Sequence, residues 1–263
     1  MSIQRIDGRT AQEIRPVNIV YNAFGYADGS VLLSIGDTKV LCTVTIQNNV
    51  PPFLRGQHIG WLTAEYAMLP NSSKDRIPRE ISLMKKNSRS TEISRFIGRA
   101  LRMMVNLTAL GERTILIDCD VLQADGGTRV AAITGASLAL QQAEKHWLQT
   151  KLIREPITTQ AIAAISIGIK DGYVIADPNY AEDSNLSADC NVVMTESGDI
   201  IELQSSAEKE PITWEQLQEI HTIARASITK LFSALDNLST EPEKKDTVFK
   251  RKKSGPLFSL QNR

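Results

Sequence analysis

The chain has 263 residues, of which 42% are hydrophobic and 23% are charged, a composition typical of a folded globular protein. Its 30 Lys and Arg residues balance its 30 Asp and Glu residues, so the net charge gives no general case for nucleic-acid binding. No apolar run is long enough to span a membrane and residues 1–16 are rich in charge, so we expect a cytoplasmic protein. Three cysteines and three histidines are widely scattered, which argues against a disulfide framework and a zinc site.

The first half of the chain predicts several strands followed by an amphipathic helix. Residues 30–47 are rich in β-branched side chains and predict two strands that turn at Gly36, and residues 58–70 predict a further strand. Residues 71–87 are polar, basic and without periodicity, which indicates a surface loop. The next helix has one apolar stripe, formed by Ile93, Phe96, Ile97, Ala100, Leu101 and Met104.

The chain then predicts a strand over residues 113–123 and a helix from about residue 129 to 147 that begins with small residues. The pair Asp171-Gly172 between two β-rich runs predicts a type I′ hairpin, and residues 189–204 predict a second hairpin. The last helix begins at a capping box of Thr213 and Gln216 and ends near Leu238. Hairpin strands separated by long helices predict an α+β fold in which helices cover the sheets.

We expect a single domain over residues 1–238, built from two halves that meet near residues 151–160. Residues 239–263 predict a disordered basic tail, because seven Lys and Arg stand against one Asp from Lys244 to Arg263 and no periodicity is present. A second basic segment, residues 71–102, holds nine Lys and Arg against three Asp and Glu. Each basic segment is open to two interpretations, an RNA contact or a solvated surface.

The stretch Gly126-Gly127-Thr128-Arg129 opens a helix and predicts an anion site, most simply for phosphate. The first N–H groups of a helix are unpaired, glycine lets the backbone approach a ligand, and arginine offers phosphate a fork of donors. The stretch lacks the lysine of a Walker A loop, which argues against a small-molecule phosphotransferase. The alternative is that Thr128 only caps the helix and Arg129 lies on the surface.

Two carboxylates predict a site for a cation or a general acid. Asp183 lies in a loop and Asp189 at the start of an apolar strand, so both can converge on one point. Such oxygen ligands suit Mg²⁺ or Mn²⁺ carrying a substrate phosphate. The alternative is an Asx-turn at Asp183 and a solvated Asp189. Asp118 and Asp120 form a rival pair on one strand face, ranked lower because two leucines share that face.

Several stretches of the chain resemble the ribonuclease PH family of phosphorolytic exoribonucleases, which trim the 3′ ends of transfer RNA precursors. They follow in order between residues 6 and 238: DGR at Asp7, VPPFLRG at Val50, GWLTAEYAMLP at Gly60, IGRALR at Ile97, GERTILIDCDVLQADGGTR at Gly111, DPNYAEDS at Asp177 and DCNVVMT at Asp189. The resemblance implies a duplicated β–α fold with two sheets between helices, and a homohexamer built as a trimer of dimers. The chain departs from the family pattern at Asn71, Ser88 and Ser205.

The resemblance also implies roles for individual residues. Inorganic phosphate, the co-substrate, is expected at four residues, Arg89, Gly127, Thr128 and Arg129. The acidic pair is expected to bind Mg²⁺, with Mn²⁺ as an alternative, and to act in catalysis through Asp183 and Asp189. The basic loop is expected to contact transfer RNA through Arg76 and Arg79.

Residues and resemblance together predict a phosphorolytic 3′→5′ exoribonuclease that acts on transfer RNA precursors. Phosphate would attack the last phosphodiester bond of the RNA and release a nucleoside diphosphate, and the reverse reaction would extend the RNA. The alternative is a non-catalytic RNA-binding subunit of a ring, because one fold hosts many roles. Such a subunit could lose the phosphate arginines or the acidic pair, whereas this chain keeps both.

Overall fold

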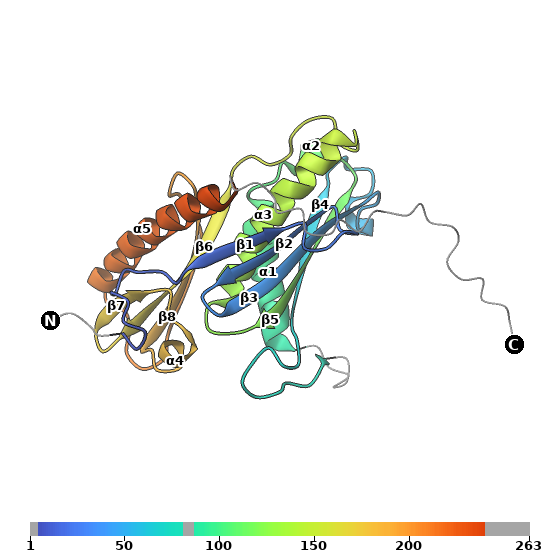
Figure 1. Cartoon of the computed structure of the whole chain (residues 1–263). Coiled ribbons are helices and arrows are strands. Elements are labelled where there is room, and N and C mark those ends of the chain that lie inside the picture. The colour runs from blue at the N-terminus through green and yellow to red at the C-terminus, as the bar shows by residue number, and fades with distance from the viewer. Residues whose placement is uncertain (1–4, 81–86, 240–263) are drawn as a thin grey trace, which may run out of the picture.

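The computed structural model describes residues 5–80 and 87–239. Within these residues the chain forms two β-sheets and five α-helices, so the predicted α+β fold is confirmed (Figure 1). None of the helices in the two described ranges combines the length and the apolar composition needed to cross a bilayer. The predicted disordered tail lies outside the described residues, except for Ser239 at the end of the last helix.

The first sheet has five strands in the order β1-β2-β3-β5-β4. Their bounds are Val17–Tyr21 for β1, Gly29–Ile35 for β2, Thr38–Gln47 for β3, Trp61–Met68 for β4 and Thr114–Gln123 for β5. Neighbours are antiparallel except β4 and β5, which run parallel. The predicted β2–β3 hairpin is confirmed, whereas β1 was not predicted, because five half-exposed residues at a sheet edge leave little pattern.

Two helices cover one face of this sheet. Helix α1 spans Ser88–Arg102 and packs on β4. The six residues of the predicted stripe are fully buried, although Met104 lies past the end of the helix. Helix α3 spans Thr128–Gln149 and packs on β2 and β3. The short helices η1, Pro52–Leu54, and α2, Leu107–Leu110, lie in the connections that flank β4 and α1.

The second sheet has four antiparallel strands in the order β7-β6-β8-β9. Their bounds are Ile162–Lys170 for β6, Tyr173–Ala176 for β7, Ala188–Thr195 for β8 and Ile200–Ala207 for β9. Both predicted hairpins are confirmed, and Asp171 and Gly172 have φ values of 50° and 79°, as a type I′ turn requires. The four-residue helix α4, Tyr180–Asp183, lies between β7 and β8.

Helix α3 joins the two sheets, because it contacts β6 and β8 as well as β2 and β3. Helix α5, Trp214–Ser239, covers β6, β7 and β8 and begins at the predicted capping box, whose two hydrogen bonds between Thr213 and Gln216 measure 3.0 and 3.2 Å. Figure 1 shows α5 along one side of the molecule and α3 at its centre. The N-terminus of α3 and the connection from β7 to β8 are thereby brought to the same end of the two sheets.

Candidate functional site

The turn before α3 has a backbone that favours glycine. Gly126 and Gly127 have φ values of 78° and 65°, in the left-handed region. Gly127 is the N-cap of α3, so no side chain caps the first turn, and Thr128 is already the first helical residue. The alternative that Thr128 caps the helix is therefore wrong. The uncapped N–H groups and the partial positive charge of a helix N-terminus are the features that hold an anion.

The Thr128 hydroxyl instead pairs with a buried tyrosine. Tyr66 of β4 lies with its hydroxyl oxygen 2.8 Å from Thr128 Oγ1. Burial raises the pKa of Tyr66 more than the Thr128 hydrogen bond and the charges of Arg89 and Arg129 lower it. Sequence analysis missed Tyr66, because an aromatic residue among apolar neighbours in a strand is typical of a core position.

The two predicted phosphate arginines come from different helices. Arg89 is the second residue of α1 and is exposed, and its N–H donates to the Asn87 side chain at 3.0 Å. The Arg129 side chain is 23% exposed, and its Nη1 lies 3.5 Å from Gln204 Oε1 and 3.6 Å from Glu92 Oε1. These distances exceed those of strong charge-assisted hydrogen bonds, so the Arg129 guanidinium can engage a closer anion.

The two carboxylates of the acidic pair are held by different elements. Asp183 is the last residue of α4, whose N-terminus has a capping box of Asn179 and Glu182. An Asx-turn at Asp183 is wrong, because the N–H two residues on, that of Asn185, donates to the Glu182 carbonyl at 2.9 Å. Asp189 lies in β8, where Ser166 Oγ donates to its Oδ1 at 2.9 Å and Asn191 Nδ2 donates to its Oδ2 at 2.8 Å. Both hydrogen bonds fix the orientation of the Asp189 carboxylate.

Electrostatics join the acidic pair to the arginines. Burial raises the pKa of Asp183, the Asp189 charge raises it further, and Arg89 and Arg129 lower it by less, so that the net shift is upward. Each of these side chains must be near enough to Asp183 to act on it. The structure therefore places both arginines near the acidic pair, and Arg129 is the second residue of α3. The roles predicted for these residues stay predictions.

The acidic pair fits the way in which proteins bind Mg²⁺. Within the described residues there is no group of three or more His, Cys, Asp or Glu side chains that could hold a metal ion. Mg²⁺ needs no such group, because it commonly uses one or two carboxylates together with water and substrate phosphates. Both carboxylates are half-buried, and the charge of Asp189 raises the pKa of Asp183. A divalent cation between them would stabilise both negative charges.

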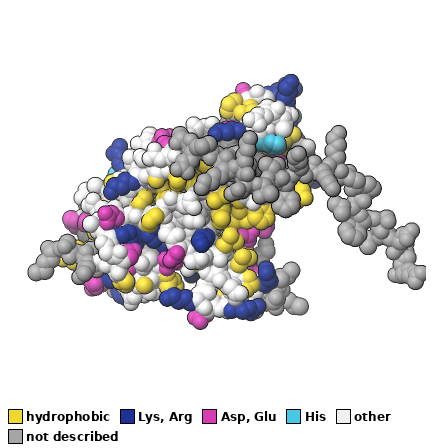
Figure 2. Space-filling view, viewed as in Figure 1, with side chains coloured by type: hydrophobic (Ala, Val, Ile, Leu, Met, Phe, Trp, Pro, Cys, Tyr) yellow, Lys and Arg dark blue, Asp and Glu magenta, His cyan; other side chains and the backbone are white. Residues whose placement is uncertain are grey.

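The basic loop lies beside this site. Arg76 and Arg79 are exposed in the connection from β4 to α1. The loop is attached at two places, because the Ala124 N–H donates to the Ser72 carbonyl at 2.7 Å and the Lys74 ammonium lies 5.5 Å from the centroid of the Tyr180 ring. Figure 2 shows Lys and Arg side chains at the lower edge of the molecule, where Figure 1 places this loop.

The rival pair, Asp118 and Asp120, does not join the site. Side chains alternate along a strand, and in the parallel register of β4 and β5 Asp118 pairs with Glu65, next to the inward-facing Tyr66. Both aspartates therefore lie on the sheet face opposite to the Tyr66–Thr128 contact. Burial raises the pKa of Asp118, and Glu65 and Asp120 raise it further.

This arrangement predicts the pH dependence of a stabilising substitution. Because the pKa of Asp118 is higher in the folded state than its ordinary 3.8, ionisation of Asp118 opposes folding, and this penalty appears as the pH rises above 3.8. Asp118→Asn is expected to raise the melting temperature at pH 7 and to lose this advantage toward pH 4. Thermal unfolding between these pH values measures the effect, with exposed Asp236→Asn as the control. A gain that grows toward low pH would contradict the assignment.

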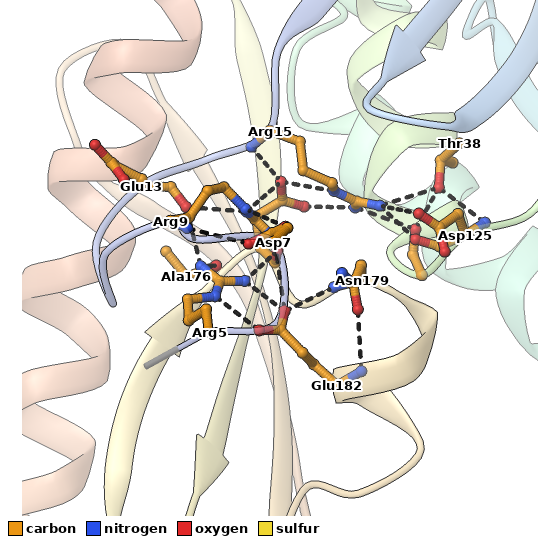
Figure 3. Close-up of polar contacts among 12 residues, drawn as sticks. Arg5, Asp7, Arg9, Glu13, Arg15, Thr38, Asp125, Ala176, Asn179 and Glu182 are labelled. Carbon is orange, nitrogen blue, oxygen red and sulfur yellow. Dashed lines mark hydrogen bonds and ion pairs between the residues drawn. The ribbon is translucent and has the colours of Figure 1, made fainter. Parts of the chain in front are cut away.

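A network of buried charges connects the glycine turn before α3 with the segment that leads to α4 (Figure 3). Arg15 binds Asp177 through Nε at 2.9 Å and through Nη2 at 2.6 Å, and Arg5 binds Glu182 through Nε at 2.8 Å and through Nη2 at 2.6 Å. Sequence analysis did not predict this network. A single arginine near the N-terminus shows no local signal that it pairs with an aspartate 162 positions away.

Family comparison gives the identity of the fold. Domain 1 of the 3′ exoribonuclease family, RNase PH, matches residues 13–146, and domain 2 of the same family matches residues 160–227. The chain belongs to the RNase PH family. The boundary between the two matches falls within residues 147–159, close to the predicted meeting point of the two halves.

Solved structures with the RNase PH fold superpose on most of the chain. Rice (Oryza sativa) Rrp46 has a TM-score of 0.71 and 21% identity, over 90% of this chain and 99% of Rrp46. A chain of the Archaeoglobus fulgidus exosome with RNA bound to the active site has a TM-score of 0.76 and 21% identity, over 88% of this chain and 92% of that chain. A chain of an archaeal exosome core has a TM-score of 0.73 and 20% identity, over 89% of this chain and 91% of that chain.

Proposed function

We propose that this RNase PH family member is a phosphorolytic 3′→5′ exoribonuclease that trims transfer RNA precursors in the cytoplasm. Inorganic phosphate is the co-substrate, nucleoside diphosphates are the products, and the active form is a homohexameric ring. The observation that carries the proposal is the convergence of two arginines, two aspartates and the uncapped N-terminus of α3. An anion site beside a carboxylate pair is what the attack of phosphate on a phosphodiester requires.

In the proposed reaction the N–H groups at the start of α3 hold the phosphate, and the guanidinium groups of Arg89 and Arg129 offset its charge. One phosphate oxygen attacks the phosphorus of the last phosphodiester bond. The bond to the 3′-oxygen of the penultimate nucleotide breaks, and that oxygen leaves with the shortened RNA. Negative charge spreads over the phosphoryl oxygens in the transition state, where fixed N–H donors and cations stabilise it.

Asp183 and Asp189 would hold Mg²⁺, which supplies charge stabilisation to phosphoryl oxygens when it is bound. The protein contributes the orientation of these carboxylates. Ser166 and Asn191 each donate to a different oxygen of Asp189, and the capping box of α4 fixes the backbone of Asp183. Both carboxylates must be ionised to bind a cation.

A non-catalytic RNA-binding ring subunit is the second candidate function. The comparisons support a subunit of a larger assembly, because two of the three superposed structures are of exosomes, one of them with RNA bound to the active site. The side chains favour the first, because this chain retains both arginines and both aspartates in one electrostatic neighbourhood. The two candidates differ in one measurable property, which is turnover of RNA.

Incubation of the protein with a transfer RNA that carries extra 3′ nucleotides separates these candidates. We expect nucleoside diphosphates, identified by chromatography, only when phosphate and Mg²⁺ are present. Release of nucleoside monophosphates without phosphate would indicate hydrolysis and overturn the proposed reaction. RNA binding without any product under all conditions would favour the ring subunit.

The basic loop predicts a salt-dependent RNA affinity. If Arg76 and Arg79 each contact one phosphate of a duplex stem, Arg76→Ala/Arg79→Ala should lower the slope of log affinity against log salt by about 1.8. Affinity for a transfer RNA, measured from low to moderate salt, gives this slope. A short single-stranded RNA should be degraded almost normally by the double variant, because it does not reach the loop.

Deletion of residues 241–263 tests the other basic segment. If this deletion removes the salt dependence and the loop variant does not, the tail is the RNA contact and the loop is a solvated surface.

A further inference from the structure

The Arg15 guanidinium contacts the turn of residues 125–127 before α3, here called the phosphate turn after its proposed role. Its side chain is 6% exposed, and its guanidinium donates to the carbonyl oxygens of Asp125 and, at 3.3 Å, Gly126 (Figure 3). Thr38 Oγ1 donates to the same Gly126 oxygen at 2.7 Å and accepts from the Asp125 N–H at 3.1 Å. Two side chains therefore hold both carbonyl groups that precede the N-cap of α3.

Holding these carbonyl groups also aims the following N–H groups. In a planar trans peptide the N–H points away from the carbonyl of the same unit. The Asp125 and Gly126 carbonyls point toward Arg15, so the N–H groups of Gly126 and Gly127 point to the opposite side. Neither N–H donates to any other described residue. They are thus directed donors at the N-terminus of α3, where the proposed phosphate binds.

The same guanidinium also binds the acidic half of the site, through Nε and Nη2. Its bidentate pair with Asp177 is buried, and Asp177 begins the segment that leads through Asn179 to α4 and Asp183. The Arg15 backbone N–H donates to Asp177 Oδ2 at 2.7 Å as well. Arg15 therefore contacts both the turn and the start of the acidic segment, residues 177–183, and the Asp125 side chain adds a second link by accepting from the Tyr180 N–H at 3.3 Å.

The turn packs closely against the acidic segment on the Gly126 side. A Cβ at Gly126 would lie 2.6 Å from the Pro178 carbonyl oxygen, and one at Gly127 would lie 3.4 Å from Arg15 Nη2. A side chain at Gly126 would therefore clash with the backbone of the acidic segment, whereas the distance to the Arg15 guanidinium is an ordinary van der Waals contact. A displacement of this guanidinium would move the donors of the turn relative to the acidic pair.

We propose that Arg15, together with Thr38, is a positioning residue for phosphate, acting by orienting the carbonyl groups of Asp125 and Gly126. This inference rests on the proposed function of the turn as the phosphate site. Arg15 itself does not contact the phosphate in this proposal. The guanidinium fork is essential to it, because one ammonium group cannot bind both Asp177 oxygens and two carbonyl oxygens.

The test measures phosphate affinity directly, by equilibrium dialysis of the full-length protein with radiolabelled phosphate. Arg15→Lys keeps the charge but loses the fork, and it should weaken phosphate binding about 10- to 100-fold, the range typical of residues that orient a ligand-binding group. Thr38→Val, which is isosteric, should weaken it in the same direction without removing a charge. RNA affinity in the absence of phosphate should change less than about twofold in both variants, because neither side chain faces the basic loop.

Arg9→Lys is the matched control. Arg9 belongs to the same network, with bonds to Asp7, Glu13 and Asp177, but it has no bond to the phosphate turn. The phosphate affinity of the Arg9→Lys variant should remain within about twofold of that of the unchanged protein. Melting temperatures of all variants show whether a loss of binding reflects unfolding, and Thr38→Val keeps the test decisive if Arg15→Lys does not fold.

The outcomes separate the inference from the proposed function. If the unchanged protein binds no phosphate, the proposed function and the inference both fail. If it binds phosphate and Arg15→Lys and Thr38→Val bind it equally well, the proposed function stands and the inference fails. Equal losses of affinity in Arg9→Lys and Arg15→Lys would mean that the network acts only on stability.

Discussion

Asp183→Asn and Asp189→Asn are each expected to lower the rate of RNA phosphorolysis about 10³-fold, while RNA binding is retained. Asparagine keeps the size of aspartate but lacks the charge that Mg²⁺ requires. A metal ion contributes several kcal/mol to the stabilisation of a phosphoryl transition state, and about 4 kcal/mol corresponds to about 10³-fold in rate. Single-turnover assays at saturating phosphate measure the loss, and binding assays in chelator measure RNA affinity.

A neighbouring acid supplies the control for these substitutions. Glu208 is near enough to contribute to the raised pKa of Asp183, but its side chain is exposed. Glu208→Gln should therefore change the rate by less than about threefold, as is usual for surface substitutions. Normal turnover by Asp183→Asn or Asp189→Asn at saturating Mg²⁺ would remove that residue from the site.

Arg129→Ala is expected to weaken apparent phosphate affinity about 10- to 150-fold, which corresponds to about 1.5–3 kcal/mol for a charge-assisted hydrogen bond. The contacts of Arg129 with Gln204 and Glu92 are long, so little structure depends on them. The loss should appear in the phosphate concentration that gives half-maximal rate, and it should leave the affinity for RNA nearly unchanged.

Arg95→Ala is the control for Arg129→Ala. Arg95 is an exposed residue of α1 and carries the same charge, so its removal tests whether general positive charge on this helix attracts phosphate. We expect no change in phosphate dependence. An unchanged phosphate dependence in Arg129→Ala as well would exclude Arg129 from the phosphate site.

The effect of Arg129→Ala also distinguishes Arg129 from Arg15. Arg129 is proposed to touch phosphate, so its effect should weaken at high salt, where exposed charges are screened. Arg15 is buried and is proposed to act through the backbone, so its effect should persist. The two arginines thus predict different salt dependences for the same measured affinity.

Local sequence patterns were sufficient for most of the elements. The stripe from Ile93 to Met104 follows the helical period, and each of its residues is buried against the core. The Asp171-Gly172 turn and the Thr213–Gln216 capping box depend on residues next to each other in the chain, so their structures follow from short-range sterics and hydrogen bonds. The glycine turn before α3 could be predicted from the sequence because it too depends on neighbouring residues.

The site was predicted only in part from the sequence. Arg129, Asp183 and Asp189 were proposed from charge and position and Arg89 from the resemblance, whereas the support around them was not predicted. Tyr66 binds Thr128 across 62 positions, and Ser166 binds Asp189 across 23 positions on a neighbouring strand. Neither contact leaves a local pattern, because tyrosine and serine are common in strands for reasons of packing alone.

The sequence by itself determined which segments form helices and hairpins, and which short turn exposes unpaired N–H groups. Only the tertiary structure decided that Arg15 contacts this turn and pairs with Asp177, 162 positions away. The same holds for Arg5, which pairs with Glu182 across 177 positions. A buried guanidinium is stable only where carboxylates and carbonyl oxygens surround it, and the packing of both sheets around α3 creates that place. This long-range pairing links the glycine turn before α3 to the segment that carries Asp183.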